Sequence, residues 1–127
     1  MNYIGEIFIL LFLALTFLQS GYEKIMDWQG NVNWLKEHFA QTFIKNHVPK
    51  SLLILLILEI IAGTLSVAGI IQIIFNDDKS LGFYGAVVSG IALLLMLYGQ
   101  RIAKDYDGAR TIVIYYIPTL VGIFLLN

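Results

Sequence analysis

Residues Ser51–Ile74, SLLILLILEIIAGTLSVAGIIQII, form an apolar stretch that contains a single charged side chain, Glu59. A transmembrane helix needs about 20 apolar residues at a rise of about 1.5 Å each, and this stretch is long enough. Pro49 suits a first helical turn and marks where the helix starts. The stretch therefore predicts a membrane-spanning helix with a carboxyl group in its interior.

Glu59 lies roughly 15 Å into this helix at the same rise, which places it near the middle of the bilayer. An ionised carboxylate at that depth costs at least about 2 to 3 kcal/mol, so the side chain should face the protein, find a partner or carry a proton. Burial favours the neutral acid. Two roles stay open for Glu59: a proton or ligand site, or a protonated carboxyl that ties helices together.

The whole composition is that of an integral membrane protein. Of its 127 residues, 58% are hydrophobic and only 13% are charged, which a soluble domain of this size could not hide. Four stretches qualify as spans: 4–22, 51–74, 81–100 and 111–126. We expect an all-α, four-helix transmembrane bundle that occupies residues 1–127 as one domain.

Several function classes find no support in the residues present. The chain has no cysteine, which excludes disulfides, thiolate catalysis and iron–sulfur ligation by this chain. Its net charge of -1 does not suggest a nucleic-acid partner. No nucleophile with an oriented base is visible, and His38 and His47 lack the spacing of metal ligands. We expect no catalytic residue, no metal and no cofactor held by this chain alone.

Basic residues predict the orientation in the membrane. Four spans place the first and third loops on one side, and seven of the eight basic residues lie there: Lys24, Lys36, Lys45, Lys50, Arg101, Lys104 and Arg110. The positive-inside rule puts these loops in the cytoplasm. Both termini should then face outward from a bacterial inner membrane.

The first loop contains an amphipathic segment at 33–44. Its apolar residues Leu35, Phe39 and Phe43 repeat every four positions, and Asn33 is suited to cap its start. We expect a helix that lies flat on the membrane surface, as amphipathic segments between spans commonly do. The alternative is that its apolar face docks on a partner subunit.

Small residues predict where the helices pack closely. Gly63 and Ser66 lie in the second span, and Gly85, Ser89 and Gly90 lie in the third. Helices associate in a bilayer through such residues because lipid tails are as apolar as leucine. The second and third spans should therefore approach each other closely.

Two tyrosines in the fourth span are candidate partners of Glu59. Tyr115 and Tyr116 lie about five residues in from the basic end of that span, roughly 8 Å deep at the helical rise. Their hydroxyls can reach further into the bundle than their backbones. We expect a ligand or proton site formed by Glu59 with one of them.

The first span carries a polar stripe, Thr16, Ser20 and Lys24, at steps of four residues, and such a stripe turns inward. Lys24 also belongs to the cytoplasmic end, together with Arg101 and Asp105. These three charged residues form a candidate cluster that binds an anionic headgroup or an oxyanion. The alternative is that they anchor helix ends and set the topology.

Three motifs resemble the DoxX family of small four-helix membrane proteins. The first span ends FLQSGYEKIMDW, which is similar to the family's glycine followed by lysine, here Gly21 and Lys24. The second span contains LEIIAGTLSVAG, which resembles the family's acidic residue followed by glycines, here Glu59 and Gly63. The third motif, YGQRIAKDYDGA, lies at the third loop.

This third motif is similar to the family's glycine, arginine and aspartate string, here Gly99, Arg101 and Asp105, and the resemblance covers the whole chain in order. One departure concerns the first helix. Many members carry a basic residue inside it, whereas here the predicted span has none and carries Glu6 near its outer end. The resemblance therefore does not carry an ion pair to Glu59 over to this chain.

The resemblance implies an accessory or assembly subunit of a membrane complex, with a link to redox chemistry and quinones. Its partners would be membrane lipids and other membrane subunits or further copies of this chain. The alternative is a small binding or transport module that holds a quinone, a lipid or an organic ligand near Glu59. A third reading, a subunit of a redox enzyme, requires a cofactor supplied by another chain.

Overall fold

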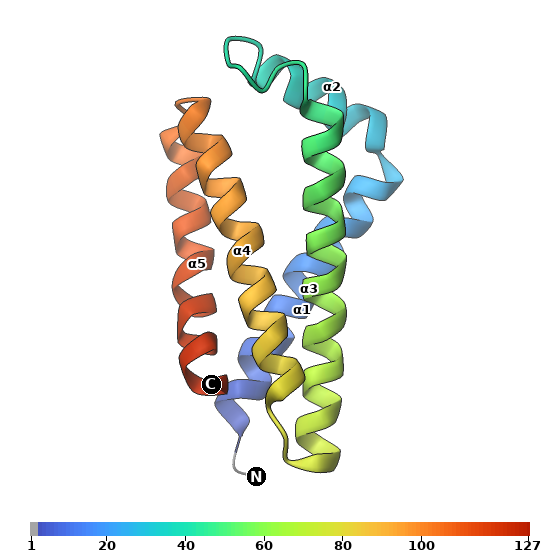
Figure 1. The fold of residues 1–127 in the computed structure, drawn as a ribbon, viewed down its shortest axis with the longest axis vertical. Coiled ribbons are helices and arrows are strands. Elements are labelled where there is room, and N and C mark those ends of the chain that lie inside the picture. The colour runs from blue at the N-terminus through green and yellow to red at the C-terminus, as the bar shows by residue number, and fades with distance from the viewer. Residues whose placement is uncertain (1–2) are drawn as a thin grey trace.

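The computed structural model describes residues 3–127. They contain four long helices and one short helix, joined by turns. The helices are α1 (Ile4–Met26), α2 (Trp28–His38), α3 (Val48–Asn76), α4 (Ser80–Ile102) and α5 (Tyr106–Leu126). All except α2 are long and apolar enough to cross a membrane. The start of α1 and the end of α5 lie at one end of the bundle, and α2 lies at the other (Figure 1). The predicted all-α membrane bundle is confirmed.

All four spans are longer at the α2 end than the sequence predicted, and the first and the fourth are extended the most. The first continues past residue 22 to Met26, and the fourth begins at Tyr106 rather than at residue 111. Asp105 caps α5, because its side chain accepts a hydrogen bond from the Gly108 N–H at 2.9 Å. Charged residues assigned to loops therefore lie on or beside helices.

The helix between the first two spans begins and ends earlier than predicted. It covers Trp28–His38 rather than 33–44, and Asn33 does not cap it. Beyond it, the Thr42 hydroxyl donates to the Phe39 carbonyl and accepts from the Ile44 N–H. These local bonds favour a turn over continued helix, and Phe43 is left 71% exposed.

The apolar side of α2 packs on the start of α3. Val32 of α2 forms a buried cluster with Val48 and Leu52 of α3, which Trp28, Leu35, Phe39 and Ile44 surround. This contact holds α2 against its own chain across the end of the bundle. Leu35 and Phe39 of the predicted apolar face therefore pack within the chain, whereas Phe43 does not.

Glycines bring α3 and α4 together, as the sequence predicted. A Cβ at Gly69 would lie 2.5 Å from the Gly82 Cα, and one at Gly85 would lie 3.0 Å from the Ser66 backbone nitrogen. Ser66 and Ser89 are fully buried, and their hydroxyls donate to carbonyls of their own helices, at Ala62 and Gly85. Backbone contact of this kind is possible only where side chains are small.

Two of the predicted packing glycines serve other helix pairs. Gly63 receives Leu18 of α1, whose Cγ would lie 2.5 Å from an added Cβ. Gly90 faces Ile123 of α5, 3.6 Å from such a Cβ. Small residues therefore set the contacts of α3 with both neighbours and one contact of α4 with α5.

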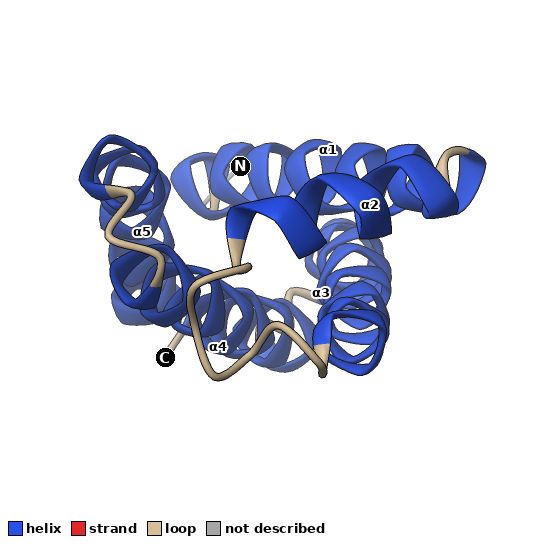
Figure 2. Ribbon diagram, turned by 90° about the horizontal axis from the view of Figure 1, so that it is seen from above, coloured by secondary structure: helices blue, strands red, loops and turns tan. Residues whose placement is uncertain are grey.

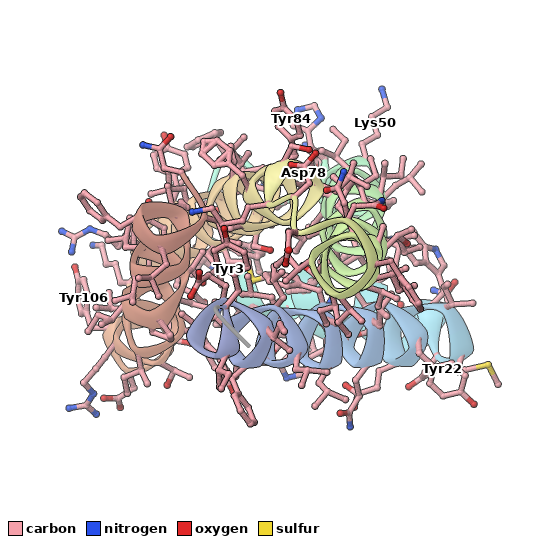
Figure 3. The ribbon with its side chains drawn as sticks, turned by 90° about the horizontal axis from the view of Figure 1, so that it is seen from below. Tyr3, Tyr22, Lys50, Asp78, Tyr84 and Tyr106 are labelled. Carbon is pink, nitrogen blue, oxygen red and sulfur yellow. The ribbon has the colours of Figure 1, made fainter. Side chains whose placement is uncertain are left out.

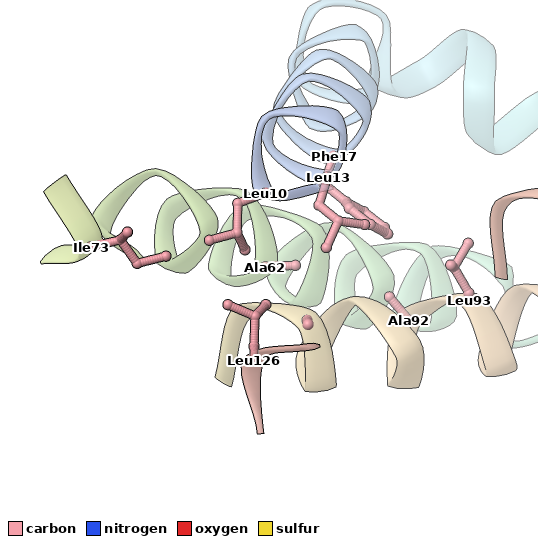
Figure 4. Close-up of a cluster of buried hydrophobic side chains, with 9 residues drawn as sticks. Leu10, Leu13, Phe17, Ala62, Ile73, Ala92, Leu93 and Leu126 are labelled. Carbon is pink, nitrogen blue, oxygen red and sulfur yellow. The ribbon is translucent and has the colours of Figure 1, made fainter. Parts of the chain in front are cut away.

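Leucines of α1 fill the centre of the bundle. Leu10, Leu13 and Phe17 are at most 1% exposed, and they pack with Ala62 of α3 and Leu93 of α4 in one core cluster (Figure 4). The termini end is closed further by Lys79, which donates to the Leu125 carbonyl at 3.0 Å.

The first helix is steeply tilted against the others. Seen from above, α1 runs lengthwise across the view, whereas α3 is seen more nearly end-on (Figure 2). Tyr22, near the end of α1, and Tyr106, at the start of α5, lie at opposite edges of the molecule (Figure 3). The two helices therefore diverge towards the α2 end.

Candidate functional site

Glu59 is completely buried, and its nearest charged neighbour is Lys24 of α1. The Lys24 Nζ lies 3.0 Å from Glu59 Oε1, and the two side chains are 15% and 0% exposed. Lys24 also donates a hydrogen bond of 2.7 Å to the Ser20 hydroxyl, one turn earlier in α1. Glu59 thus has a cationic partner inside the bundle, which the sequence did not predict.

The extension of α1 explains this ion pair. Lys24 lies in the last turn of the helix and not in a loop. The helical backbone therefore fixes the direction in which the Lys24 side chain projects. Gly21, one turn before it, lies against α3, since an added Cβ there would be 3.5 Å from Ile60 and 3.6 Å from Leu56. The α1 backbone is therefore close enough to α3 for the lysine to reach Glu59.

The carboxylate remains incompletely satisfied. The contact with Lys24 has the distance of an ion pair without the alignment of a hydrogen bond, and neither oxygen of Glu59 accepts a hydrogen bond from the described residues. Buried polar atoms without such a partner are uncommon in folded proteins and call for an explanation. Glu59 therefore keeps acceptor capacity in the interior of the bundle.

A cleft of about 420 Å³ lies between α1, α4 and α5, where α1 diverges from α5. One wall is the polar side of α1, with Thr16, Ser20 and Glu23 at successive turns. The complete lining is Leu15, Thr16, Phe17, Gln19, Ser20, Glu23, Leu93, Met96, Ile112 and Tyr115. Thr16 and Ser20 of the polar stripe predicted on the first span line this cleft, whereas Lys24 does not.

Ser20 connects this cleft to the ion pair. Its side chain lines the cleft, and its hydroxyl oxygen accepts from Lys24, which in turn contacts Glu59. Two contacts, of 2.7 and 3.0 Å, therefore lead from the cleft wall to the buried carboxylate. Glu59 lies behind the cleft wall rather than in it.

The two tyrosines are not partners of Glu59. Tyr115 lines the cleft, and its ring stacks on Phe12 of α1 with centroids 5.9 Å apart. Tyr116 packs against the hydrophobic core. The prediction that a tyrosine hydroxyl donates a hydrogen bond to Glu59 is wrong. The tilt of α1 brings Lys24 to the carboxylate instead.

The three residues of the predicted charged cluster have different partners. Lys24 pairs with Glu59, and the Arg101 guanidinium lies 5.9 Å from the centre of the Tyr106 ring. Asp105 caps α5 and lies 3.6 Å from the His38 ring. The cluster is therefore not assembled as one anion site.

His38 is a residue whose position the sequence did not reveal. Its Nε2 lies 2.8 Å from Gln100 Oε1 of α4 and 3.6 Å from Asp105, and its ring stacks on Trp34. These contacts tie α2 to the turn between α4 and α5. Nothing in the loop sequence signals them, because Gln100 lies 62 residues further along the chain.

Comparison with known proteins adds no relative. No family model, curated protein or solved structure matches this chain. Among residues 3–127, no three His, Asp or Glu side chains gather to form a metal site. The proposals below therefore rest on the geometry of the ion pair and the cleft.

Proposed function

We propose that this chain is a membrane-embedded binding module that holds one small lipid-soluble molecule in the cleft between α1, α4 and α5. The observation that carries the proposal is a cleft of about 420 Å³ with a polar wall, formed by helices that are long and apolar enough to cross a membrane. Small-molecule sites commonly have volumes of about 300 to 1,000 Å³ and combine an apolar lining with a few placed polar groups. Membrane lipids and quinones both have this mixed character.

The cleft has apolar residues on one side and hydrogen-bonding residues on the other. Leu93, Met96 and Ile112 offer apolar surface to the body of the ligand, and methionine adapts its shape easily. On the facing side, Thr16 and Gln19 of α1 offer hydrogen-bonding groups. Polar side chains exposed to lipid would be costly, so a ligand that bonds to them lowers the free energy of this arrangement.

The ion pair acts on the cleft through Ser20. Because the Ser20 oxygen accepts from Lys24, its own proton is available to a ligand acceptor in the cleft. Glu59 fixes the Lys24 ammonium from the other side. The pair thereby orients a donor on the cleft wall, which is a positioning role.

Two kinds of surface that an accessory subunit could use for assembly are used within the chain. The apolar side of α2 covers the start of α3, and the small residues at Gly63, Ser66 and Gly90 lie in contacts between helices of the bundle. They therefore no longer favour assembly with other subunits over ligand binding.

The proposed location is a bacterial inner membrane with the α2 end in the cytoplasm. Support comes from the basic residues, since Lys79 is the one basic residue of the opposite end. The resemblance to the DoxX family agrees with this location. Labelling tests it: the chain lacks cysteine, so Lys45→Cys should be protected from an impermeant maleimide added outside intact cells, and Asn127→Cys should react.

The binding proposal is tested with the purified protein in lipid nanodiscs. Native mass spectrometry should detect one lipid-soluble molecule retained per chain, and Thr16→Trp should abolish retention because the indole fills the cleft. Leu11→Trp is the matched control, since Leu11 lies on α1 outside the cleft and is 41% exposed. Equal retention by both variants, or none by the unaltered protein, would overturn the proposal.

A further inference from the structure

The cleft carries an unbalanced negative charge. Glu23 is the one charged residue among the lining residues, and it forms no ion pair with the described residues 3–127. It is exposed at the α2 end of α1, where the cleft begins. A molecule in the cleft therefore meets a carboxylate and no lining cation.

Three bases at this end, Lys24, Arg101 and Arg110, do not offset this charge, and Arg110 is paired with Asp107 at 2.7 Å. Lys24 follows Glu23 in the chain, but its ammonium is turned to Glu59 and Ser20. Arg101 lies against the ring of Tyr106, which projects at an outer edge of the molecule (Figure 3). Because Lys24 and Glu59 cancel each other, the net charge at the cleft wall is that of Glu23.

An aromatic ring adds to the preference for positive charge. Tyr115 lines the cleft, is 37% exposed, and is held by its stacking on Phe12. The face of such a ring attracts cations, and the attraction grows where water is excluded. Tyr115 lies on α5 beside Phe12, about three turns of α1 away from Glu23, so the ring and the carboxylate favour positive charge at two separate places along the cleft.

We propose that the cleft selects lipophilic cations: molecules with an apolar body and one delocalised or alkylated positive charge. This inference rests on the proposed binding function and narrows its ligand class. The body contacts Leu93, Met96 and Ile112, and the positive charge lies near Glu23. Anionic headgroups are disfavoured, since the cleft would place them beside an uncompensated carboxylate of like sign.

Three probes of similar shape separate charge from hydrophobicity. Tetraphenylphosphonium is cationic, triphenylphosphine oxide is neutral and tetraphenylborate is anionic. Calorimetric titration into the protein in zwitterionic nanodiscs, corrected with empty nanodiscs, should show the cation binding about tenfold more tightly than the neutral probe, a difference that one carboxylate near a protein surface can supply at an effective dielectric constant of about 20. The preference should weaken at high salt because Glu23 is exposed.

Variants at position 23 identify the source of the preference. Glu23→Gln should weaken the affinity for tetraphenylphosphonium about tenfold and leave triphenylphosphine oxide within about twofold. Glu23→Asp should keep the order of the probes, and Glu23→Lys should reverse it. Glu37→Gln is the control, because Glu37 is an exposed acid of α2 outside the cleft. Glu23 is itself exposed, so these variants should fold, and circular dichroism checks that they do.

The outcomes separate this inference from the proposed function. If the neutral or anionic probe binds best and Thr16→Trp still abolishes its binding, the cleft binds ligands but does not select cations. If no probe binds and no lipid is retained, the binding function itself fails. A cation preference that survives Glu23→Gln would assign it to another part of the molecule and overturn the inference.

Discussion

The two halves of α1 pack in opposite ways. Towards the termini, Leu10 is fully buried, and one of its methyl groups would lie 2.7 Å from a Cβ at Gly82 of α4. Ile9 approaches Gly122 of α5 to a similar distance, 2.7 Å from an added Cβ. Towards α2, the same helix turns Thr16 to a cleft where α5 is no longer beside it.

This difference shows what closes a helical bundle in a membrane. Where glycines face the leucines of α1, the helices meet and no polar group is needed. Where α1 diverges, its inward side carries Ser20 and Lys24, and a buried acid on α3 holds them. Small residues allow close helix packing in the half of the molecule near the termini, the sealed half. In the half near α2, the open half, the Lys24–Glu59 pair holds α1 against α3.

The largest expected effect comes from breaking the ion pair. Lys24→Met leaves Glu59 in the interior without its counter-ion and should lower the free energy of unfolding by about 3 to 5 kcal/mol. Unfolding in mixed micelles, followed by circular dichroism, measures this change. Lys36→Met is the control, because Lys36 is exposed on α2 and should matter little.

A double variant shows whether the loss arises from the orphaned charge. Lys24→Met combined with Glu59→Leu removes both charges and should recover most of the lost stability, because apolar pairs often replace buried ion pairs without cost. A sum of two independent losses would mean that the 3.0 Å contact is not what couples these residues.

Adding a single methyl group in the sealed half should lower the stability of the protein. Gly69→Ala places a Cβ 2.5 Å from the Gly82 Cα, so α3 and α4 must separate, and we expect a loss of about 1 to 3 kcal/mol. Gly90→Ala is the matched control, since its Cβ would meet Ile123 at an ordinary 3.6 Å. Equal thermal stability of the two variants would show that the α3–α4 contact tolerates separation.

The sequence predicts the sealed half better than the open half. Apolar stretches of sufficient length identify the four spans, and small residues such as Ser66 and Gly85 identify a close contact between α3 and α4. Both are local patterns whose spacing follows from the helical repeat. The polar stripe with Ser20 was recognised for the same reason.

The partner of Glu59 could not be obtained in this way. It depends on two facts that no local pattern contains: α1 continues to Met26, and it tilts so that its end crosses α3. A span that ends at residue 22 leaves Lys24 at the cytoplasmic end beyond the helix, although its spacing continues the stripe of Thr16 and Ser20. The early end of α2 was missed because the hydrogen bonds of Thr42 with Phe39 and Ile44 outweigh the apolar period of the segment.

The smallest expected effect concerns how α2 covers the open half. His38→Phe keeps a ring to stack on Trp34 but removes the contacts with Gln100 and Asp105, so α2 should open more easily, by about 1 kcal/mol. Hydrogen exchange of the amides of α2 should then be about fivefold faster, with α3 unchanged. His47→Phe is the control, because His47 is exposed and its side chain has no hydrogen bond within residues 3–127. Unchanged exchange in α2 would assign its position to the Val32 cluster with α3 alone, and the open half would then be covered by apolar packing as the other half is.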